Sequence, residues 1–275
     1  MFKQIILIGA VTFVISTLLM WAFQRQLIYY PSREIPRLID YQANDMRVVL
    51  LHTQDGLVLN SWYKPADARQ PTIIYLHGNA GNIGGSMPLV RQLIHAGLGV
   101  LLLEYRGYGG NPGHPTEQGL YEDGRAGIRF LNQHGVASDH IIVYGESLGS
   151  GVATQLAIEN KIGALILQSP YTSICDMARY HYPWLLIKPL DRFESIKRIQ
   201  QINAPLLILH SMNDEVVPYS QGLALFQRAI EPKKMLAFKT ENHNNLWNSP
   251  GFSEKISDFI IHYWRPSKTR VFSNG

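Results

Sequence analysis

From residue 72 onward, short apolar segments alternate with longer segments whose apolar residues recur at helical spacing. Continuous apolar runs are typical of strands buried on both faces, and strands that alternate with helices form a mostly parallel sheet with helices on both faces. The sequence therefore predicts an α/β fold, in which ligands bind beyond the carboxyl ends of the strands. The expected strands are residues 72–77, 98–104, 140–144, 164–168, 205–210 and 234–239, and the expected helices are residues 87–96, 116–133, 147–159, 220–230 and 253–263.

An antiparallel hairpin is expected ahead of this region. Residues 47–52 and 57–63 are short apolar segments on either side of Gln54-Asp55-Gly56, which is a tight turn signal. We expect this hairpin to lie at one edge of the sheet.

Composition and charge narrow the class of protein. The chain is 46% hydrophobic and 17% charged, which suits one sizeable core and argues against disorder. Its net charge is +4, but Lys and Arg form no dense run, so nucleic-acid binding is not expected. The single cysteine, Cys175, cannot form an intramolecular disulfide, and we interpret it as a small apolar residue.

The N-terminal segment is apolar enough to enter a membrane. Residues 5–23 carry no charge, and as a helix they span about 28 Å, close to the roughly 30 Å hydrocarbon core of a bilayer. Trp21 lies where an interfacial anchor is expected. A cleaved signal sequence is the alternative, but the run is long and no small-x-small cleavage site follows Met20. We expect an uncleaved single-pass anchor, and the sparse charges on both flanks leave its orientation open.

A nucleophile motif lies between an expected strand and an expected helix. Gly145-Glu146-Ser147-Leu148-Gly149 matches G-x-S-x-G, a weak signal alone that gains force from its strand–turn–helix context. A serine on such a sharp turn exposes its hydroxyl, and the following helix N-terminus offers N–H groups to developing negative charge. We therefore predict Ser147 as the nucleophile.

A second Gly-rich loop follows the strand at residues 72–77. In a hydrolase, the backbone N–H of Asn79 in this loop and that of Leu148 would form the oxyanion hole. The alternatives are a plain turn with helix capping or a phosphate-binding loop. The phosphate-binding loop is poorly supported because no Lys-Ser or Lys-Thr follows the glycines.

A serine nucleophile needs a base and an acid that orients it. His243 lies in a polar loop after the last expected strand, which fits the chain order serine, acid, histidine. Asp214 follows the strand at residues 205–210 and is the expected acid. Glu215 is a close competitor for this role, and Asp191 is a distant one.

Several ordered segments resemble the α/β-hydrolase superfamily, and more narrowly the small membrane-anchored ABHD-type proteins related to the yeast bud-emergence hydrolase. The resemblance implies Ser147, Asp214 and His243 as a triad, Asn79 and Leu148 backbones as the oxyanion hole, and no cofactor or metal. The matching segments are LHGNAGN at 76–82, EYRGYGGNPGHPTEQGL at 104–120, YGESLGSGVA at 144–153, QSPYTSI at 168–174 and HSMNDEVVPYSQG at 210–222, with a poorer match in ENHNNL at 241–246.

The chain departs from this family pattern at three positions near the expected acid and base. Ser211 stands where relatives usually carry Gly, Asn242 stands where Gly usually precedes the histidine, and Asn245 stands where Asp usually follows it. These departures are expected to change loop shape or local charge.

A long insertion separates the strands that end at Gln168 and begin at Pro205. We expect it to form a lid over Ser147, whose apolar side chains either line an acyl-chain pocket or pack the lid onto the body. These side chains are Tyr171, Met177, Tyr180, Tyr182, Trp184, Leu185, Leu186, Ile187 and Phe193.

The expected organisation is a membrane anchor over residues 1–24, a connector over 25–45, an α/β-hydrolase domain over 46–267 with its lid at about 171–200, and a tail over 268–275. The expected function is hydrolysis of ester or thioester bonds in apolar acyl substrates near a membrane, with an acylated small molecule, a lipid or an acylated protein as the substrate. The alternatives are a non-catalytic membrane scaffold that retains the fold, or a serine peptidase.

Overall fold

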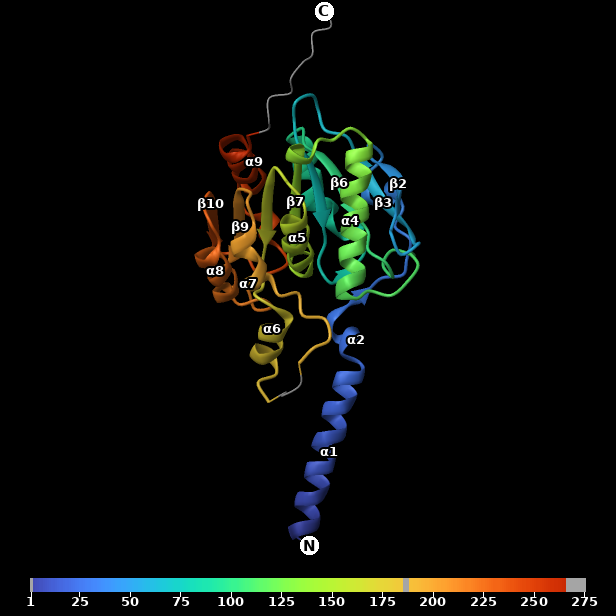
Figure 1. Cartoon of the computed structure of the whole chain (residues 1–275), viewed down its shortest axis with the longest axis vertical. Coiled ribbons are helices and arrows are strands. Elements are labelled where there is room, and N and C mark those ends of the chain that lie inside the picture. Colours follow the sequence, from blue (N-terminus) through green and yellow to red (C-terminus); the bar gives the residue numbers. More distant parts are fainter. Residues whose placement is uncertain (1, 185–187, 266–275) are drawn as a thin grey trace, which may run out of the picture.

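The computed structural model describes residues 2–184 and 188–265. An α/β domain sits at one end of the long N-terminal helix α1 (Phe2–Ala22), which projects away from it (Figure 1). The lid residues Leu185, Leu186 and Ile187, residues 266–267 at the expected domain end and the expected tail at 268–275 lie outside the described residues.

One eight-stranded sheet forms the centre of the domain, in the order β10-β9-β8-β7-β4-β6-β3-β2. The strands from β10 to β6 are parallel, whereas β3 is antiparallel to both β6 and β2. The mostly parallel sheet is confirmed, and the expected hairpin forms one of its edges. The strands are β2 (Arg47–His52), β3 (Val58–Lys64), β4 (Thr72–Leu76), β6 (Gly99–Leu103), β7 (Ile141–Glu146), β8 (Ala164–Gln168), β9 (Leu206–Ser211) and β10 (Lys233–Phe238).

Helices cover both faces of the sheet, each over its own apolar core. One core packs side chains of α4, α5 and α8 against the sheet, and the other packs side chains of α3 and α9 against the opposite face. The helices of the domain are α3 (Met87–His95), α4 (Glu117–Gln133), α5 (Leu148–Glu159), α6 (Ile174–His181), α7 (Ser195–Arg198), α8 (Tyr219–Arg228) and α9 (Phe252–Tyr263). Short 3₁₀ helices cover Leu38–Tyr41, Ile83–Ser86, Ser138–His140, Ile199–Gln201 and Leu246–Asn248.

The continuous apolar runs of the sequence became the central strands. Every residue of β4, β6 and β8 is buried, because helices pack on both of their faces. The edge strand β2 instead alternates between exposed and buried residues at its end. Parallel pairing brings the carboxyl ends of β4, β7, β8, β9 and β10 to one side of the sheet, where the loops that carry Asn79, Ser147, Asp214 and His243 begin.

The segment expected as a connector contains regular structure. It begins with α2 (Gln24–Ile28) and continues into the short strand β1 (Tyr30–Pro31). This strand pairs in parallel with β5 (Ala80–Gly81), which belongs to the Gly-rich loop after β4. The connector is thereby attached to the loop that was predicted to supply an oxyanion donor.

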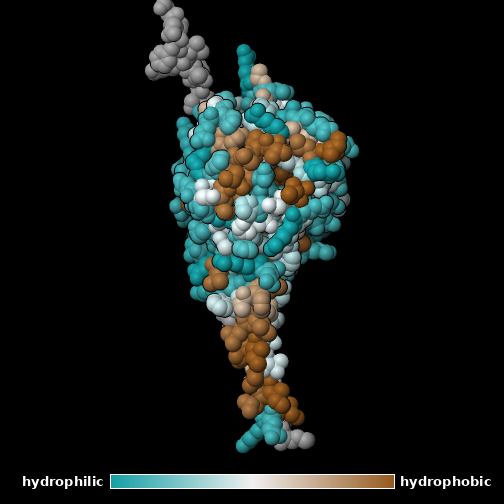
Figure 2. All heavy atoms as spheres, turned by 90° about the vertical axis from the view of Figure 1, so that its right-hand side faces the viewer, coloured by the Kyte–Doolittle hydropathy of each residue, from teal (hydrophilic) through white to brown (hydrophobic). Residues whose placement is uncertain are grey.

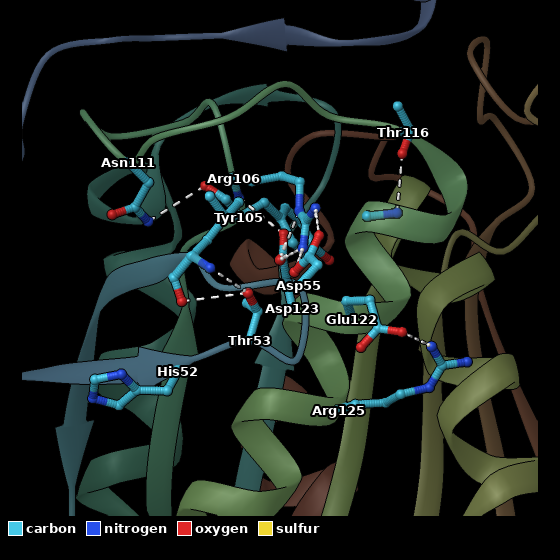
Figure 3. Close-up of polar contacts among 12 residues, drawn as sticks. His52, Thr53, Asp55, Tyr105, Arg106, Asn111, Thr116, Glu122, Asp123 and Arg125 are labelled. Atoms are coloured by element: carbon cyan, nitrogen blue, oxygen red, sulfur yellow. Dashed lines mark hydrogen bonds and ion pairs between the residues drawn. The ribbon is translucent and has the colours of Figure 1, made fainter.

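A partly buried ion-pair cluster joins the hairpin turn to the body of the domain (Figure 3). Arg106 Nε donates to Asp123 Oδ1 at 2.8 Å, and Arg106 Nη1 donates to Asp55 Oδ2 at 2.6 Å. Asp55 lies in the turn between β2 and β3, Arg106 follows β6, and Asp123 lies in α4. This Arg106 cluster (Asp55, Arg106 and Asp123) therefore ties together three segments that are far apart in the sequence.

Helix α1 is long, apolar and largely exposed. None of its residues is buried, and its mean hydropathy over an 18-residue window is 2.4. In the space-filling view it forms a hydrophobic column below a domain whose visible face is hydrophilic around a hydrophobic patch in its upper part (Figure 2). By length and composition, α1 is able to cross a membrane.

Candidate active site

Ser147 occupies a strained turn between β7 and α5. Its φ is +48° and its ψ is −114°, in a region that side chains of L-residues rarely adopt. Its N–H donates to the carbonyl of Gln168 at 2.9 Å, which ties the turn to the end of β8. The hydroxyl is therefore held at the carboxyl edge of the sheet, ahead of the first turn of α5.

The two glycines of the motif allow this turn to pack closely. A Cβ on Gly149 would lie 2.0 Å from the carbonyl oxygen of Leu76, and a Cβ on Gly145 would lie 2.5 Å from the carbonyl oxygen of Gly149. Any side chain at either position would push α5 away from β4 or β7. The spacing G-x-S-x-G is thus explained by backbone contact on both sides of the serine.

Asp214 lies in the loop after β9 and is fixed by several donors. Its Oδ1 accepts the N–H groups of Val216 at 2.9 Å and Val217 at 2.7 Å. Burial raises the pKa of Asp214, but hydrogen bonds from His210, His243 and the Val217 N–H outweigh burial and hold that pKa well below its usual range. The carboxylate therefore stays ionised near neutral pH.

His243 bridges Asp214 and Ser147. Its Nδ1 lies 2.7 Å from Asp214 Oδ2, and its Nε2 lies 3.0 Å from Ser147 Oγ. With Nδ1–H donating to the carboxylate, Nε2 is left with a lone pair directed at the hydroxyl. The structure thus brings together three side chains that the sequence had placed in three separate loops.

The competing acids lie elsewhere. Glu215 is exposed to solvent. Asp191 is buried, but it accepts from Arg25 Nε at 3.0 Å and from the Tyr29 hydroxyl at 3.1 Å. Among the three acidic residues considered from the sequence, Asp214 is the one hydrogen-bonded to His243.

The three departures from the family pattern lie in contacts that shape the Asp214 and His243 loops. The Ser211 hydroxyl donates to the carbonyl of Glu241 and accepts from the N–H of Asn213. Asn245 Oδ1 accepts the N–H of Asn242 at 2.6 Å, which closes a tight turn around His243. Ser211 therefore joins the loop of the acid to the loop of the histidine.

Both expected oxyanion residues line the cavity beside Ser147. Leu148 is the first residue of α5, so its N–H lies at the positive end of the helix and has no carbonyl one turn earlier to bind. Asn79 is held from two sides, since its carbonyl accepts from the Tyr30 N–H and from the Tyr108 hydroxyl, each at 2.8 Å. The carbonyl of Asn79, on the far side of its Cα from the expected donor N–H, is therefore held in place.

Two chambers meet at Ser147. The apolar chamber, of about 330 Å³, lies between the lid helix α6 and the N-terminal helices, and Leu27, Ile28, Ile174, Met177 and Val217 are among its lining residues. The polar chamber, of about 510 Å³, lies on the side of β4 and the His243 loop, and Tyr75, Asn82, Ser86, Glu146 and Asn244 are among its lining residues. Ser147 and Asn79 line both. A bond positioned at the hydroxyl could thus have an apolar group on one side and a polar group on the other.

Comparisons with known proteins agree with this architecture. The profile of the family described as Serine aminopeptidase, S33 matches residues 67–194. An uncharacterized Mycobacterium tuberculosis protein is 39% identical over 86% of this chain and 84% of its own length. Protein bem46 of Schizosaccharomyces pombe is 32% identical over 88% of this chain and 87% of its own length. The chain belongs to the α/β-hydrolase family, in the ABHD-type branch related to bem46.

Two further similarities add detail to this α/β hydrolase. Lysophosphatidylserine lipase ABHD12 of Danio rerio is 31% identical over 72% of the chain and 60% of that lipase. The Pyrococcus furiosus esterase Pf2001 superposes with a TM-score of 0.70 at 18% identity, over 86% of this chain and 98% of the esterase. The similarity to the Pyrococcus furiosus esterase shows that the two proteins share a fold.

The lid of this hydrolase divides between the two roles expected for it. Tyr171, Met177 and Tyr182 line the apolar chamber. Phe193 is fully buried and packs edge-on against Tyr121, with 5.6 Å between ring centroids, so it holds the lid on the body. Part of the insertion therefore lines the apolar chamber and part of it packs onto the body, and the acyl-chain role of the chamber stays a prediction.

One residue of the Asp214 environment was not identified from the sequence. His210, at the end of β9, is fully buried, and its Nε2 lies 3.3 Å from Asp214 Oδ2 and 2.9 Å from the carbonyl oxygen of Val217. Its position four residues before Asp214 gave no signal of this contact, because the loop between them doubles back on the strand.

Proposed function

We propose that this hydrolase cleaves carboxylic ester or thioester bonds of apolar acyl substrates, with Ser147 as nucleophile, His243 as general base and Asp214 as the orienting acid. The observation that carries the proposal is the 3.0 Å separation of His243 Nε2 from a serine hydroxyl that opens onto both chambers. The short contact between His243 and an ionised Asp214 supports the same roles.

In the proposed reaction, Ser147 Oγ attacks the acyl carbonyl while His243 Nε2 takes the hydroxyl proton. The N–H groups of Asn79 and Leu148 stabilise the oxyanion, and His243 then returns the proton to the leaving alcohol or thiol. Water, activated by His243, attacks the acyl-enzyme and releases the acid. Asp214 stabilises the imidazolium in both steps, and no metal or organic cofactor is needed.

The substrate class follows from the two chambers. The apolar chamber suits a hydrocarbon chain, because burial of each CH₂ group contributes about 0.8 kcal/mol. The polar chamber, with Glu146, Ser86 and Asn244, suits a leaving group that bears hydroxyl or amine groups. We also propose that α1 anchors the protein in a membrane, which places the site near lipids or lipid-modified molecules.

Labelling with a fluorophosphonate probe tests the enzyme proposal against the scaffold alternative. The probe is expected to label the full-length protein in detergent, and Ser147→Ala is expected to remove that label. Ser220→Ala, which changes an exposed serine of α8, is the matched control and should label like the wild type. Correctly folded protein that is not labelled at Ser147 would contradict the proposal and support the scaffold.

Substrate profiling tests the bond and acyl preference. The detergent-solubilised enzyme is assayed with oxygen esters and thioesters of graded acyl length, and with aminoacyl anilides because the matched family profile is described as a serine aminopeptidase. Ser147-dependent cleavage is expected to rise with acyl length. Preferential cleavage of the anilides would support the peptidase alternative, and much faster cleavage of short soluble esters would contradict the apolar preference.

A further inference from the structure

The N-terminal helices form one wall of the apolar chamber. Met20 and Trp21 in the last turns of α1, and Leu27 and Ile28 in α2, line the same cavity as Ser147. These residues face the lid helix α6 across the cavity. The chamber is therefore lined by the last turns of α1, and α2 and α6 lie at the same end of the domain as α1 (Figure 1).

Polar contacts fasten this junction to the end of the lid. Asp191 accepts from Arg25 and Tyr29 and also from the N–H of Glu117 at 3.2 Å, so it connects α2 to the start of α4. Gln24 Oε1 accepts the N–H of Leu190 at 2.6 Å. Because Asp191 and Gln24 are buried, these bonds are protected from water and hold the anchor end in one position.

The same junction also holds the oxyanion loop. Asn79 Nδ2 donates to the carbonyl of Ile28 at 2.9 Å, and the Tyr30 N–H donates to the carbonyl of Asn79 at 2.8 Å. The pairing of β1 with β5 extends this link by two residues. The residue whose N–H is proposed to bind the oxyanion is thus held, through its side chain and its carbonyl, by the segment that directly follows α1.

Apolar side chains at the junction are exposed around the chamber. Trp21 and Leu27 are 42% and 45% exposed while lining the chamber, and Trp184 in the lid lies beside α1, with its ring centroid 6.1 Å from that of Phe13. Exposed apolar surface around a cavity favours an apolar occupant. The contact with Phe13 places Trp184 beside the part of α1 that is proposed to lie in the bilayer.

We propose that the anchor junction, residues 20–29, is part of the substrate site: it forms one wall of the acyl chamber and receives the acyl chain directly from the bilayer along α1. This inference rests on the proposed function and adds a second role for the anchor. The occupant is a single hydrocarbon chain of a lipid or lipid-modified substrate, whose carbonyl reaches Ser147 while the rest of the chain lies between α2 and α6.

Photocrosslinking of the full-length wild-type protein tests this directly. The probe is a long-chain alkyl fluorophosphonate with a diazirine in its chain, added to protein reconstituted in phosphatidylcholine vesicles. After Ser147 is phosphonylated, light crosslinks the chain to its neighbours, and mass spectrometry identifies the peptides. Crosslinks are expected in residues 17–30 and in the lid at 174–184. Crosslinks confined to the polar chamber, for example to Leu89 or Trp247, would overturn the inference while leaving the proposed function intact.

If Ser147 is not phosphonylated, the proposed function and this inference both fail. A matched pair of variants provides a second readout. Leu27→Trp narrows the chamber and is expected to lower the ratio of long-chain to short-chain kcat/KM at least tenfold. Leu7→Trp makes the same change on the exposed surface of α1, away from the chamber, and should keep the wild-type ratio. An unchanged ratio in folded Leu27→Trp would overturn the inference.

Discussion

The Ser147 cluster (Ser147, His243 and Asp214) and the Arg106 cluster use similar components in different ways. Each contains a buried aspartate that contacts a nitrogen-bearing side chain. In the Arg106 cluster, the guanidinium directs its donors at two carboxylates that hold it from both sides. In the Ser147 cluster, His243 uses one ring nitrogen on Asp214 and directs the other at a hydroxyl that faces two chambers.

The two buried aspartates, Asp123 and Asp214, also differ in the direction of their pKa shifts. Burial raises the pKa of Asp123 to about 6 despite the hydrogen bonds from Arg106. Burial also raises the pKa of Asp214, but hydrogen bonds from His210, His243 and the Val217 N–H outweigh burial and hold that pKa well below its usual range. The Val216 and Val217 N–H groups and the two histidines thus surround the Asp214 carboxylate with hydrogen-bond partners. The comparison predicts that substitutions in the Ser147 cluster lower activity, whereas substitutions in the Arg106 cluster lower stability.

Removal of the nucleophile is expected to give the largest effect. Ser147→Ala should lower kcat by about a millionfold if the cluster acts as a unit. Its melting temperature should stay within about 2 °C of the wild type, because the hydroxyl faces a cavity rather than a packed core. Ester hydrolysis and thermal unfolding in detergent measure the two quantities. Residual activity above about one percent would break the assignment of Ser147 to the chemistry.

Loss of the Asp214 charge is expected to give the next largest effect. Asp214→Asn should lower kcat by about ten-thousandfold, because an amide no longer selects the tautomer with Nδ1–H toward position 214. Glu215→Gln is the matched control and should keep wild-type activity, since Glu215 is exposed and lies beside the acid in sequence alone. A larger loss in Glu215→Gln than in Asp214→Asn would reverse the assignment of the acid.

Arg106→Met is expected to reduce stability rather than catalysis. It leaves the fully buried Asp123 carboxylate without its cation, which should cost about 3 kcal/mol and lower the melting temperature by roughly 6–12 °C. Because the folded pKa of Asp123 lies above its unfolded value, its contribution is favourable at low pH and is lost as pH rises through about 6. The destabilisation should therefore be larger at pH 8 than at pH 5.

A neighbouring arginine in Figure 3 serves as the control for this change. Arg125 forms ion pairs with Glu122 and Glu159 whose side chains are about a quarter exposed, so Arg125→Met should cost less than about 1 kcal/mol. Similar melting temperatures for the two variants would contradict the distinction between a buried and a surface ion pair. Full esterase activity in folded Arg106→Met would sharpen the separation of the two clusters.

The members of the Ser147 cluster could be predicted from the sequence, whereas the Arg106 cluster could not. The strand–turn–helix around Ser147 is visible because strand and helix periodicity meet at a five-residue motif. The order of the parallel strands places the loops of Asp214 and His243 on the same edge as Ser147. That topology brings the three candidate side chains to one edge, and the packing of their loops then sets the hydrogen-bond distances.

No sequence pattern indicates the pairing of β1 with β5 or the contact of Arg25 with Asp191. A two-residue strand has no measurable periodicity, and Arg25 is separated from Asp191 by 166 positions. Both contacts depend on where α1 leaves the domain, which is a property of the packed structure. The division of the lid between chamber and core likewise required the position of α6 relative to α2.

The smallest predicted effect concerns Asp55, the outer member of the Arg106 cluster. Hydrogen bonds from Arg106 lower the pKa of Asp55 to about 2, but its side chain is 45% exposed, so solvent screens most of the interaction. Asp55→Asn should cost less than about 1 kcal/mol at pH 7. Because the folded pKa lies below the unfolded value near 3.9, the wild-type advantage should be present above pH 4 and disappear as pH falls toward 2. Melting curves from pH 7 to pH 2.5 measure it, and an advantage that grows on acidification would show that Asp55 is held by forces other than its ion pair with Arg106.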